Sequence, residues 1–204
     1  MDELVKTNSF AKRNTLLAIR ENELVFNHFS IDLESVTGFK YGIDAIRLDM
    51  YSIGRKYLIG FKTRHGEVKI VFKCYMGLGS KYFNTTYRSV LEEIWQKTVV
   101  RLVKEAIDMI RKGQSVNVGK CQVSERGISC NGELIRWVDL SYQKNYNRLT
   151  INSKSNPKVC TNLYYLENFN VDVLIGILHW VFDQDGIKEL TYKNSAGSKS
   201  LEGR

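Results

Sequence analysis

Apolar and polar residues alternate in short runs along the first third of the chain. The runs are rich in β-branched and aromatic residues and have the period of two that is typical of strands: 16–19, 23–26, 29–36, 46–53, 57–63 and 68–73. Asn27 and His28 lie between two of these runs and suit a tight hairpin, and His65-Gly66 is expected to form another turn. The pattern therefore predicts antiparallel sheet in this region.

The period then changes to three and four residues. From about Thr86 to Arg111 it predicts one amphipathic helix, which Lys112-Gly113 should end because glycine readily adopts a left-handed conformation. Its expected buried face is Leu91, Ile94, Trp95, Val99, Leu102, Val103, Ala106, Ile107 and Ile110.

Strand-like alternation returns after this helix. The expected strands are 116–118, 121–124, 127–130, 133–142, 149–152 and 159–164, with Asn131-Gly132 as the strongest hairpin signal in the chain. Asn170 is expected to cap a final helix over Val171–Asp183. The charge-free apolar run inside that helix, Val173 to Phe182, is shorter than the roughly 20 residues that span a bilayer, so we interpret it as buried and expect no transmembrane segment.

The second set of elements repeats the first at a constant shift of 104 positions. Glu21 falls on Glu125, Ile31 on Ile135 and Val36 on Leu140, and the two hairpin turns also coincide. Such self-similarity predicts two copies of one small domain. The expected domains are 1–112 and 113–190, followed by a flexible polar tail over 191–204 that we exclude from function.

Charge separates the two copies. The chain carries a formal charge of +8, and residues 1–112 hold 19 Lys and Arg against 13 Asp and Glu, whereas residues 113–190 hold 8 of each kind. The hydrophobic content of 43% and charged content of 25% are those of a globular protein. The sequence thus predicts a basic first domain and a neutral second one.

The order of elements in each half, six or seven short strands followed by one helix, resembles the pleckstrin-homology-like (PH-like) fold. The second half is also similar to bacterial PH-like proteins in the run from Gly127-Ile128 to Ile135-Arg136-Trp137-Val138-Asp139-Leu140. The resemblance implies a mainly β chain with some α, built as two tandem PH-like β-barrels or sandwiches of antiparallel strands, each closed by its C-terminal helix.

A binding scaffold is what this resemblance implies for function. Eukaryotic members of the family hold phosphoinositide headgroups with basic residues between their first two strands, but Arg20-Glu21-Asn22 and Ser124-Glu125-Arg126 are short and contain an acid. Headgroup recognition in that manner is therefore not expected. Bacterial members are adaptors or envelope domains, so we expect a non-enzymatic binding or adaptor protein.

Basic residues in the first copy are the candidate binding site. Lys62 and Arg64 share one strand parity, and Lys69 and Lys73 share another, so each pair should project to one face. The expected ligand-binding residues are Arg47, Arg55, Lys56, Lys62, Arg64, Lys69, Lys73 and Lys81. They would attract an anionic protein, membrane surface or ligand. A solvated sheet exterior that keeps the protein soluble is the alternative.

Two further functions stay open at this point. Lys40-Tyr41, Lys56-Tyr57 and Lys81-Tyr82-Phe83 interleave cations with rings, as in proteins that stack on nucleic-acid bases. The loop from Gly77 to Lys81 precedes a helix and could hold the phosphate of a nucleotide, which would make the chain a nucleotide-binding or sequestering protein.

Catalytic chemistry has no visible motif. The three histidines have no motif-linked nucleophile, and the four cysteines lack the close spacing of a zinc site, so we expect neither an enzyme nor a metal or other cofactor. Because no signal peptide is visible, we expect a cytoplasmic protein, with peripheral association with a membrane as a variant. Cys121 and Cys130 should then remain reduced thiols, even on neighbouring strands.

Overall fold

The computed structural model describes residues 9–10, 17–26, 29–76 and 80–183 of the 204-residue chain. The turn expected at Asn27-His28, most of the loop from Gly77 to Lys81 and the tail over 191–204 lie outside these described residues. The chain divides into two compact units, one made of 1–102 with 165–169 and the other of 103–164 with 170–204.

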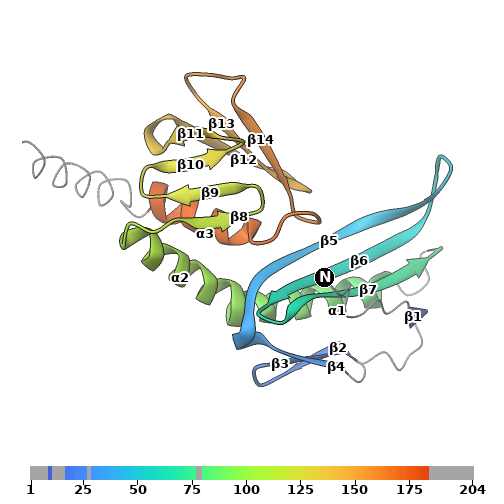
Figure 1. The fold of residues 1–204 in the computed structure, drawn as a ribbon. Helices are drawn as coiled ribbons and strands as arrows, with labels where there is room; N and C mark the ends of the chain where they lie inside the picture. The colour runs from blue at the N-terminus through green and yellow to red at the C-terminus, as the bar shows by residue number, and fades with distance from the viewer. Residues whose placement is uncertain (1–8, 11–16, 27–28, 77–79, 184–204) are drawn as a thin grey trace, which may run out of the picture. The chain divides into compact units, whose positions relative to one another are not determined.

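The first unit contains two sheets (Figure 1). The smaller sheet is antiparallel and consists of β2 (Leu17–Arg20), β3 (Glu23–Phe26) and β4 (Phe29–Asp32). A 3-10 turn, η1 (Leu33–Ser35), leads to the larger sheet, whose strand order is β1-β7-β6-β5. Its strands are β1 (Ser9–Phe10), β5 (Val36–Leu48), β6 (Tyr51–Thr63) and β7 (Gly66–Tyr75).

One continuous helix follows, in three parts: α1 (Ser80–Ile94), a π-helical turn η2 (Trp95–Val99) and α2 (Val100–Arg111). It begins before Thr86 because its first turns make contacts that apolar periodicity does not reveal. The Phe83 ring lies 5.8 Å from Phe72, and Asn84 accepts a 2.7 Å hydrogen bond from the Tyr57 hydroxyl. The predicted C-terminus is confirmed, with Gly113 at φ 76°.

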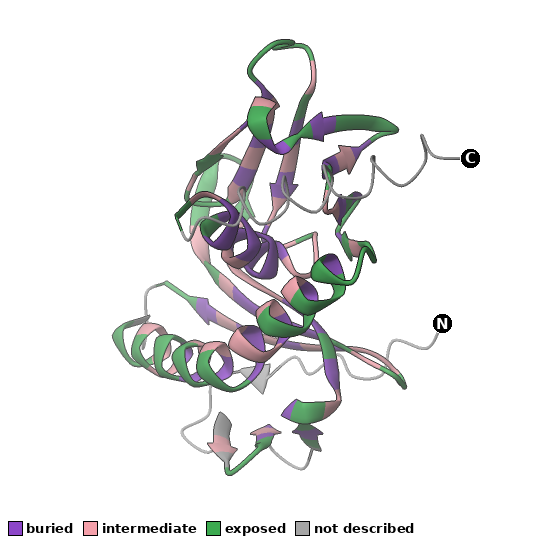
Figure 2. Cartoon of the chain, turned by 90° about the vertical axis from the view of Figure 1, so that its left-hand side faces the viewer, coloured by how far each residue is buried: buried purple, intermediate pink, exposed green. Residues whose placement is uncertain are grey.

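Aromatic packing forms the core between α1 and the larger sheet. Figure 2 shows which stretches of the chain are buried. The Tyr57 ring stacks on Phe72 at 4.9 Å and meets the edge of Tyr87 at 5.3 Å. The Tyr87 hydroxyl accepts from the Gly42 amide at 2.9 Å and donates to the Leu58 carbonyl at 2.9 Å. These bonds anchor the helix to β5 and β6.

The second unit has the same kinds of element. One sheet has the order β11-β10-β9-β8 and the other the order β12-β13-β14, with a 3-10 turn η3 (Trp137–Asp139) between β11 and β12. The strands are β8 (Val116–Val118), β9 (Cys121–Ser124), β10 (Gly127–Cys130), β11 (Glu133–Arg136), β12 (Leu140–Lys144), β13 (Arg148–Ser153) and β14 (Cys160–Tyr164). The closing helix is α3 (Val171–Asp183), which is buried along most of its length.

All of these sheets are open, so the closed β-barrels among the expected architectures are wrong. Each sheet ends in edge strands, such as β5, that form no hydrogen-bonded pairing on their outer side with another described strand, whereas a closed barrel has no edge strands. The coarser prediction of a mainly β chain with a few helices is confirmed.

The repeat seen in the sequence extends to strand pairing. Leu17 pairs with Phe26 in the first unit, and Cys121 pairs with Cys130 in the second. The turns η1 and η3 likewise occupy positions related by the shift of 104. The shift therefore preserves which residues face each other across the two smaller hairpins.

Three expected strands differ from the structure. The runs 29–36 and 133–142 are each interrupted by a 3-10 turn. In the first run the Asp32 carboxylate accepts a 2.9 Å hydrogen bond from the Glu34 amide, so this amide does not take part in strand pairing. The run 46–53 contains the turn between β5 and β6, where Asp49 adopts a φ of 52°. Aspartate tolerates that left-handed conformation better than most residues.

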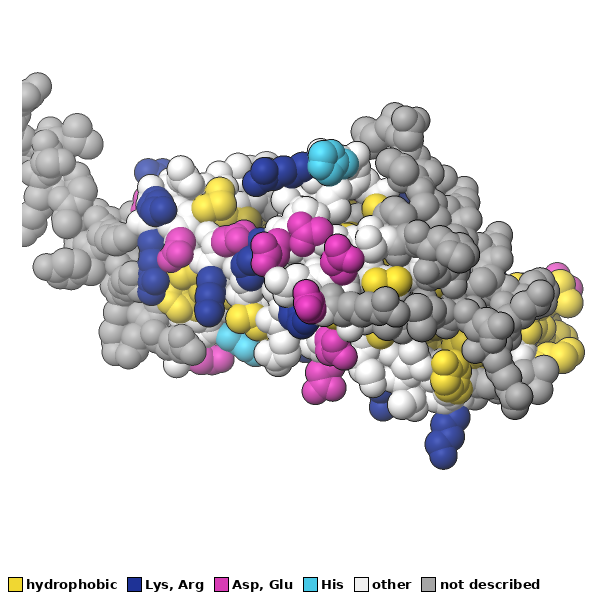
Figure 3. All heavy atoms as spheres, turned by 90° about the horizontal axis from the view of Figure 1, so that it is seen from below, with side chains coloured by type: hydrophobic (Ala, Val, Ile, Leu, Met, Phe, Trp, Pro, Cys, Tyr) yellow, Lys and Arg dark blue, Asp and Glu magenta, His cyan; other side chains and the backbone are white. Residues whose placement is uncertain are grey.

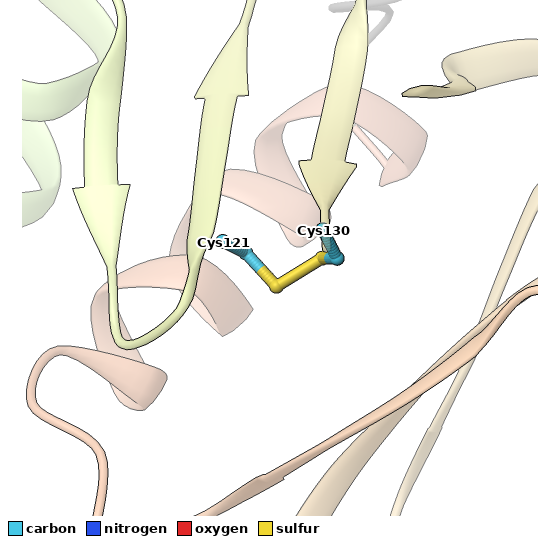
Figure 4. The surroundings of a disulfide bond; sticks show 2 residues. All are labelled: Cys121 and Cys130. Atoms are coloured by element: carbon cyan, nitrogen blue, oxygen red, sulfur yellow. A yellow bond between two sulfur atoms is a disulfide. The ribbon is translucent and has the colours of Figure 1, made fainter. Parts of the chain in front are cut away.

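Cys121 and Cys130 form a disulfide between β9 and β10 (Figure 4). The expectation of reduced thiols is therefore wrong for this pair, because the strand register sets the two residues directly opposite each other with a Cα–Cα distance of 4.4 Å. Close approach of this kind is typical of a non-hydrogen-bonded pair. The other two cysteines are Cys74, which is buried, and Cys160, which is exposed.

Within the described ranges, no helix combines the length and the apolar character that crossing a membrane requires.

Candidate functional site

The pairing of β5, β6 and β7 sorts the residues of the larger sheet onto two faces. Tyr57, Ile59 and Phe61 alternate along β6 and are buried, and Tyr57 contacts the aromatic rings of α1. Residues between them project from the opposite face, because successive strand residues alternate. The opposite face is where the register gathers five lysines.

Five lysines form what we call the lysine face: Lys40, Lys56, Lys62, Lys69 and Lys73. The register sets Lys56 directly opposite Lys73, and it sets Gly60 between Lys40 on β5 and Lys69 on β7. Residues directly opposite on paired strands project to the same side of a sheet. Four of these five lysines, all except Lys40, are among the eight binding residues predicted from the sequence. The structure thus brings together half of the predicted residues.

Lys40 was placed by sequence reasoning only among the nucleic-acid candidates, because the extent of β5 was not predicted. Its side chain lies across Gly60, where a Cβ would be 2.9 Å from the Lys40 Cγ, and its ammonium group lies 4.1 Å from the centre of the Phe169 ring. Burial lowers the pKa of Lys40, Glu67 raises it, and Lys69 lowers it further. Lys40 is therefore a partly desolvated cation.

Two acids temper the charge of the lysine face. Glu67 stands directly opposite Lys62, and Asp44 stands opposite Lys56. With five lysines against two carboxylates, this face keeps a formal charge of +3.

The other four predicted residues lie elsewhere. Arg55 pairs with the buried Cys74, so it is on the α1 side of the sheet, and it lines a cavity of about 530 Å³ together with Asn84 and Met76. Arg47 is exposed near the end of β5, Arg64 lies in the turn between β6 and β7, and Lys81 lies in the first turn of α1.

A group of exposed apolar side chains at the turn between β5 and β6 was not anticipated. We call this group the hairpin tip: Leu48, Met50, Tyr51 and Met76, which are 63%, 91%, 74% and 85% exposed. The Met76 amide donates a 2.9 Å hydrogen bond to the Ile53 carbonyl, which ties the end of β7 to the same region. The signal missed in the sequence was an apolar run interrupted by Asp49, which favours a turn over a strand.

The view from below shows how the surface is distributed (Figure 3). Acidic and basic side chains are interspersed across the middle of this face, and hydrophobic side chains gather at its right-hand end, the end at which the β5–β6 hairpin projects in Figure 1. Charge alone therefore does not mark one site on this view, and although hydrophobic side chains also appear elsewhere on it, a larger group of them lies at this end.

Metal chemistry finds no basis within the described parts of the chain, where no three His, Cys, Asp or Glu side chains gather in a group that could hold an ion. Comparison with protein-family models, with curated proteins and with solved structures finds no match to this chain.

Proposed function

We propose that this chain is a non-enzymatic binding protein of two tandem PH-like units, whose first unit recognises an anionic surface through the lysine face. The observation that carries the proposal is the strand register, which places Lys56, Lys62, Lys69 and Lys73 on the side of the sheet opposite α1. A side chain buried in the core could not contact a partner, but Lys62 is exposed and the other three lysines are partly exposed.

The order of elements supports the PH-like part of the proposal. In each unit an antiparallel sheet of short strands is followed by a 3-10 turn, a second sheet and a helix, and the second sheet is antiparallel except for the parallel pairing of β1 with β7 in the first unit. The repeat of both the register and the turn at the shift of 104 supports a duplication of one module.

Electrostatics favours a partner with many negative charges. A basic residue close to an anionic membrane contributes about 1 kcal/mol to binding, and this attraction decays over about 10 Å at 0.1 M salt. Several lysines on one face act together only if the partner presents several anions at once. We therefore expect the affinity to fall steeply as salt is raised.

Of the alternatives, nucleic-acid binding loses part of its basis. Tyr57 is wholly buried, and Tyr41 is half-buried, with its ring 5.4 Å from Phe39 and 6.3 Å from Tyr165. These two rings therefore cannot stack on bases beside their neighbouring lysines. The nucleotide alternative rests on a loop that lies mostly outside the described residues.

Charge reversal tests the proposal. We expect the substitution of Lys56, Lys62, Lys69 and Lys73 by Glu to weaken capture on beads coated with polyglutamate, and on vesicles with a third of anionic lipid, by at least a hundredfold, because attraction becomes repulsion. Cosedimentation and bead capture at 50 and 300 mM salt measure this loss.

A matched control comes from the second unit. Lys120, Lys144, Lys154 and Lys158 are also exposed, and their substitution by Glu changes the net charge of the chain by the same amount. Circular dichroism establishes that both variants are folded. If both lose binding equally, total charge and not the lysine face is responsible, and if neither does, the proposal fails.

A further inference from the structure

The hairpin tip is exposed on a strand pair that extends beyond the rest of its sheet. Pairing between β6 and β7 begins at Gly54 and Tyr75, so Tyr51 and Ser52 pair only with β5 among the described strands, and Ile53 lies at a register shift without a partner in β5. Asp49 and Met50 form the turn at the end of this two-stranded ribbon (Figure 1). The tip is thus a narrow projection of the first unit.

Exposed apolar side chains are concentrated at this projection. Single exposed apolar residues are normal on any protein, but a contiguous group is typical of an interaction site. Met50 is 91% exposed, Tyr51 is 74% exposed and Leu48 is 63% exposed, all within four consecutive residues. The Tyr51 side chain also has the amphipathic character that suits the boundary between hydrocarbon and water.

Cations surround the base of the tip. Arg47 is adjacent to Leu48 in the chain, Lys56 and Lys73 oppose each other on the lysine face, and Arg55 lies on the α1 face of the same ribbon. The positive charges therefore occur on both sides of the projection. The end is apolar except for Asp49 in the turn, and the cations on both faces behind it outnumber Asp44, which stands opposite Lys56. This arrangement matches the layers of an anionic bilayer, in which acyl chains lie beneath a plane of phosphates.

We infer that the hairpin tip inserts into the surface of an anionic lipid bilayer, with Leu48, Met50 and Tyr51 entering the apolar layer and the surrounding cations contacting lipid phosphates. The inference rests on the proposed function and names the anionic surface as a membrane. A protein partner would need a deep apolar pocket that is ringed with acids, whereas a bilayer meets a convex tip with cations on both sides without any special shape.

Removal of the apolar side chains without change of charge provides the test. The full-length variant with Leu48→Ser and Met50→Ser is compared with wild type for cosedimentation with vesicles of phosphatidylcholine and phosphatidylglycerol at 7:3. We expect at least a tenfold loss of binding, because each side chain transferred out of water adds to the affinity. Wild type should bind vesicles of pure phosphatidylcholine at least tenfold more weakly.

The matched control uses exposed apolar residues of the second unit. Val138 and Tyr146 are 70% and 90% exposed, close to the exposure of Leu48 and Met50. We expect the variant with Val138→Ser and Tyr146→Ser to bind within twofold of wild type. Thermal unfolding of both variants checks that neither has lost its fold.

A fluorescent probe reports insertion directly. An environment-sensitive dye is attached at Met50→Cys or, as control, at Tyr146→Cys, with the exposed Cys160 replaced by Ser so that it does not react. We expect anionic vesicles to shift the emission of the dye at position 50 to the blue, and brominated lipids to quench it. The dye at position 146 should do neither.

The outcomes separate the two proposals. If wild type binds anionic vesicles but the dye at position 50 stays in water and the serine variant binds equally well, insertion is wrong and the lysine face alone suffices. If polyglutamate is bound but vesicles are not, the membrane is wrong and an anionic protein is the partner. If neither is bound, both proposals fail, and if the tip variant abolishes a dimer instead, the tip joins two copies.

Discussion

Gly127 illustrates how a single residue constrains the second unit. It adopts a φ of +148°, and a Cβ built there would lie 2.0 Å from the Ile135 carbonyl oxygen and 2.9 Å from the Arg136 Cα. Both distances are shorter than a van der Waals contact, and both obstructing atoms belong to the backbone. Glu23 occupies the equivalent position of the first unit, so this requirement is specific to the second.

We expect Gly127→Ala to lower the free energy of unfolding of the second unit by about 3 kcal/mol or more, because β10 and β11 must move apart. Urea unfolding followed by tryptophan fluorescence measures this change. Gly132 is the control, since its φ is +85° but nothing lies within 4 Å of the added Cβ. Gly132→Ala should cost only about 1 kcal/mol of backbone strain, and equal effects of the two variants would refute the steric explanation.

At the scale of elements, alternation predicted the short strands well and the long ones poorly. The strands β8, β9 and β10 and the helix α3 have the bounds expected from the sequence. The long strands β5 and β6 contain glycines that normally indicate turns, but here they allow close approach. Gly54 is an example, because a Cβ there would lie 2.3 Å from the Cys74 carbonyl oxygen.

The candidate site was likewise predictable only in part. Parity along one strand is a local property, so the common face of Lys56 and Lys62, and that of Lys69 and Lys73, could be read from spacing. The inclusion of Lys40 and the position of the hairpin tip depend on where β5 ends and which residues it pairs with. Those are long-range properties that the sequence pattern does not encode locally.

The hairpin of β9 and β10 carries a covalent crosslink that its counterpart lacks, since Leu17 and Phe26 occupy the equivalent positions. We expect the double variant Cys121→Ala and Cys130→Ala to lower the free energy of unfolding by about 2 to 3 kcal/mol, because closing a short loop restricts the unfolded chain. Calorimetry under oxidising conditions measures the loss, with Cys160→Ala as the control.

Thiol titration in denaturant gives an independent check of this crosslink. With Cys121 and Cys130 bonded, only Cys74 and Cys160 should react before a reductant is added. Protein isolated from its native source with four reactive thiols would contradict the disulfide. Two reactive thiols would favour an oxidising compartment over the cytoplasm expected from the sequence, since cytosolic proteins are kept reduced.

At the scale of the whole molecule, one helix contributes to both units. The division between the units falls after Leu102, inside α2. Tyr87 and Ile94 are buried in the first unit, whereas Ala106 and Ile110 are buried in the second. The same helix therefore supplies buried residues to both cores, each within its own unit.

The π-helical turn over Trp95–Val99 determines where that helix tolerates a change in length. A π turn accommodates one residue more than the α-helix around it, so deletion of the exposed Gln96 should restore an uninterrupted α-helix, with Ile94 and Leu102 of the first unit still buried. The regular α2 holds no such extra residue. Deletion of the exposed Lys104 should turn Ala106 and Ile110 by about 100° relative to Val103, which packs beside Gly176 in the same unit.

We therefore expect the Gln96 deletion to keep a cooperative thermal transition close to that of wild type, and the Lys104 deletion to abolish the transition of the second unit. Differential scanning calorimetry distinguishes these results, and equal damage by the two deletions would contradict the explanation. Tolerance to shortening in this chain should thus be a property of helix geometry: the loss of one of two exposed residues that lie eight positions apart should leave the fold intact, and the loss of the other should not.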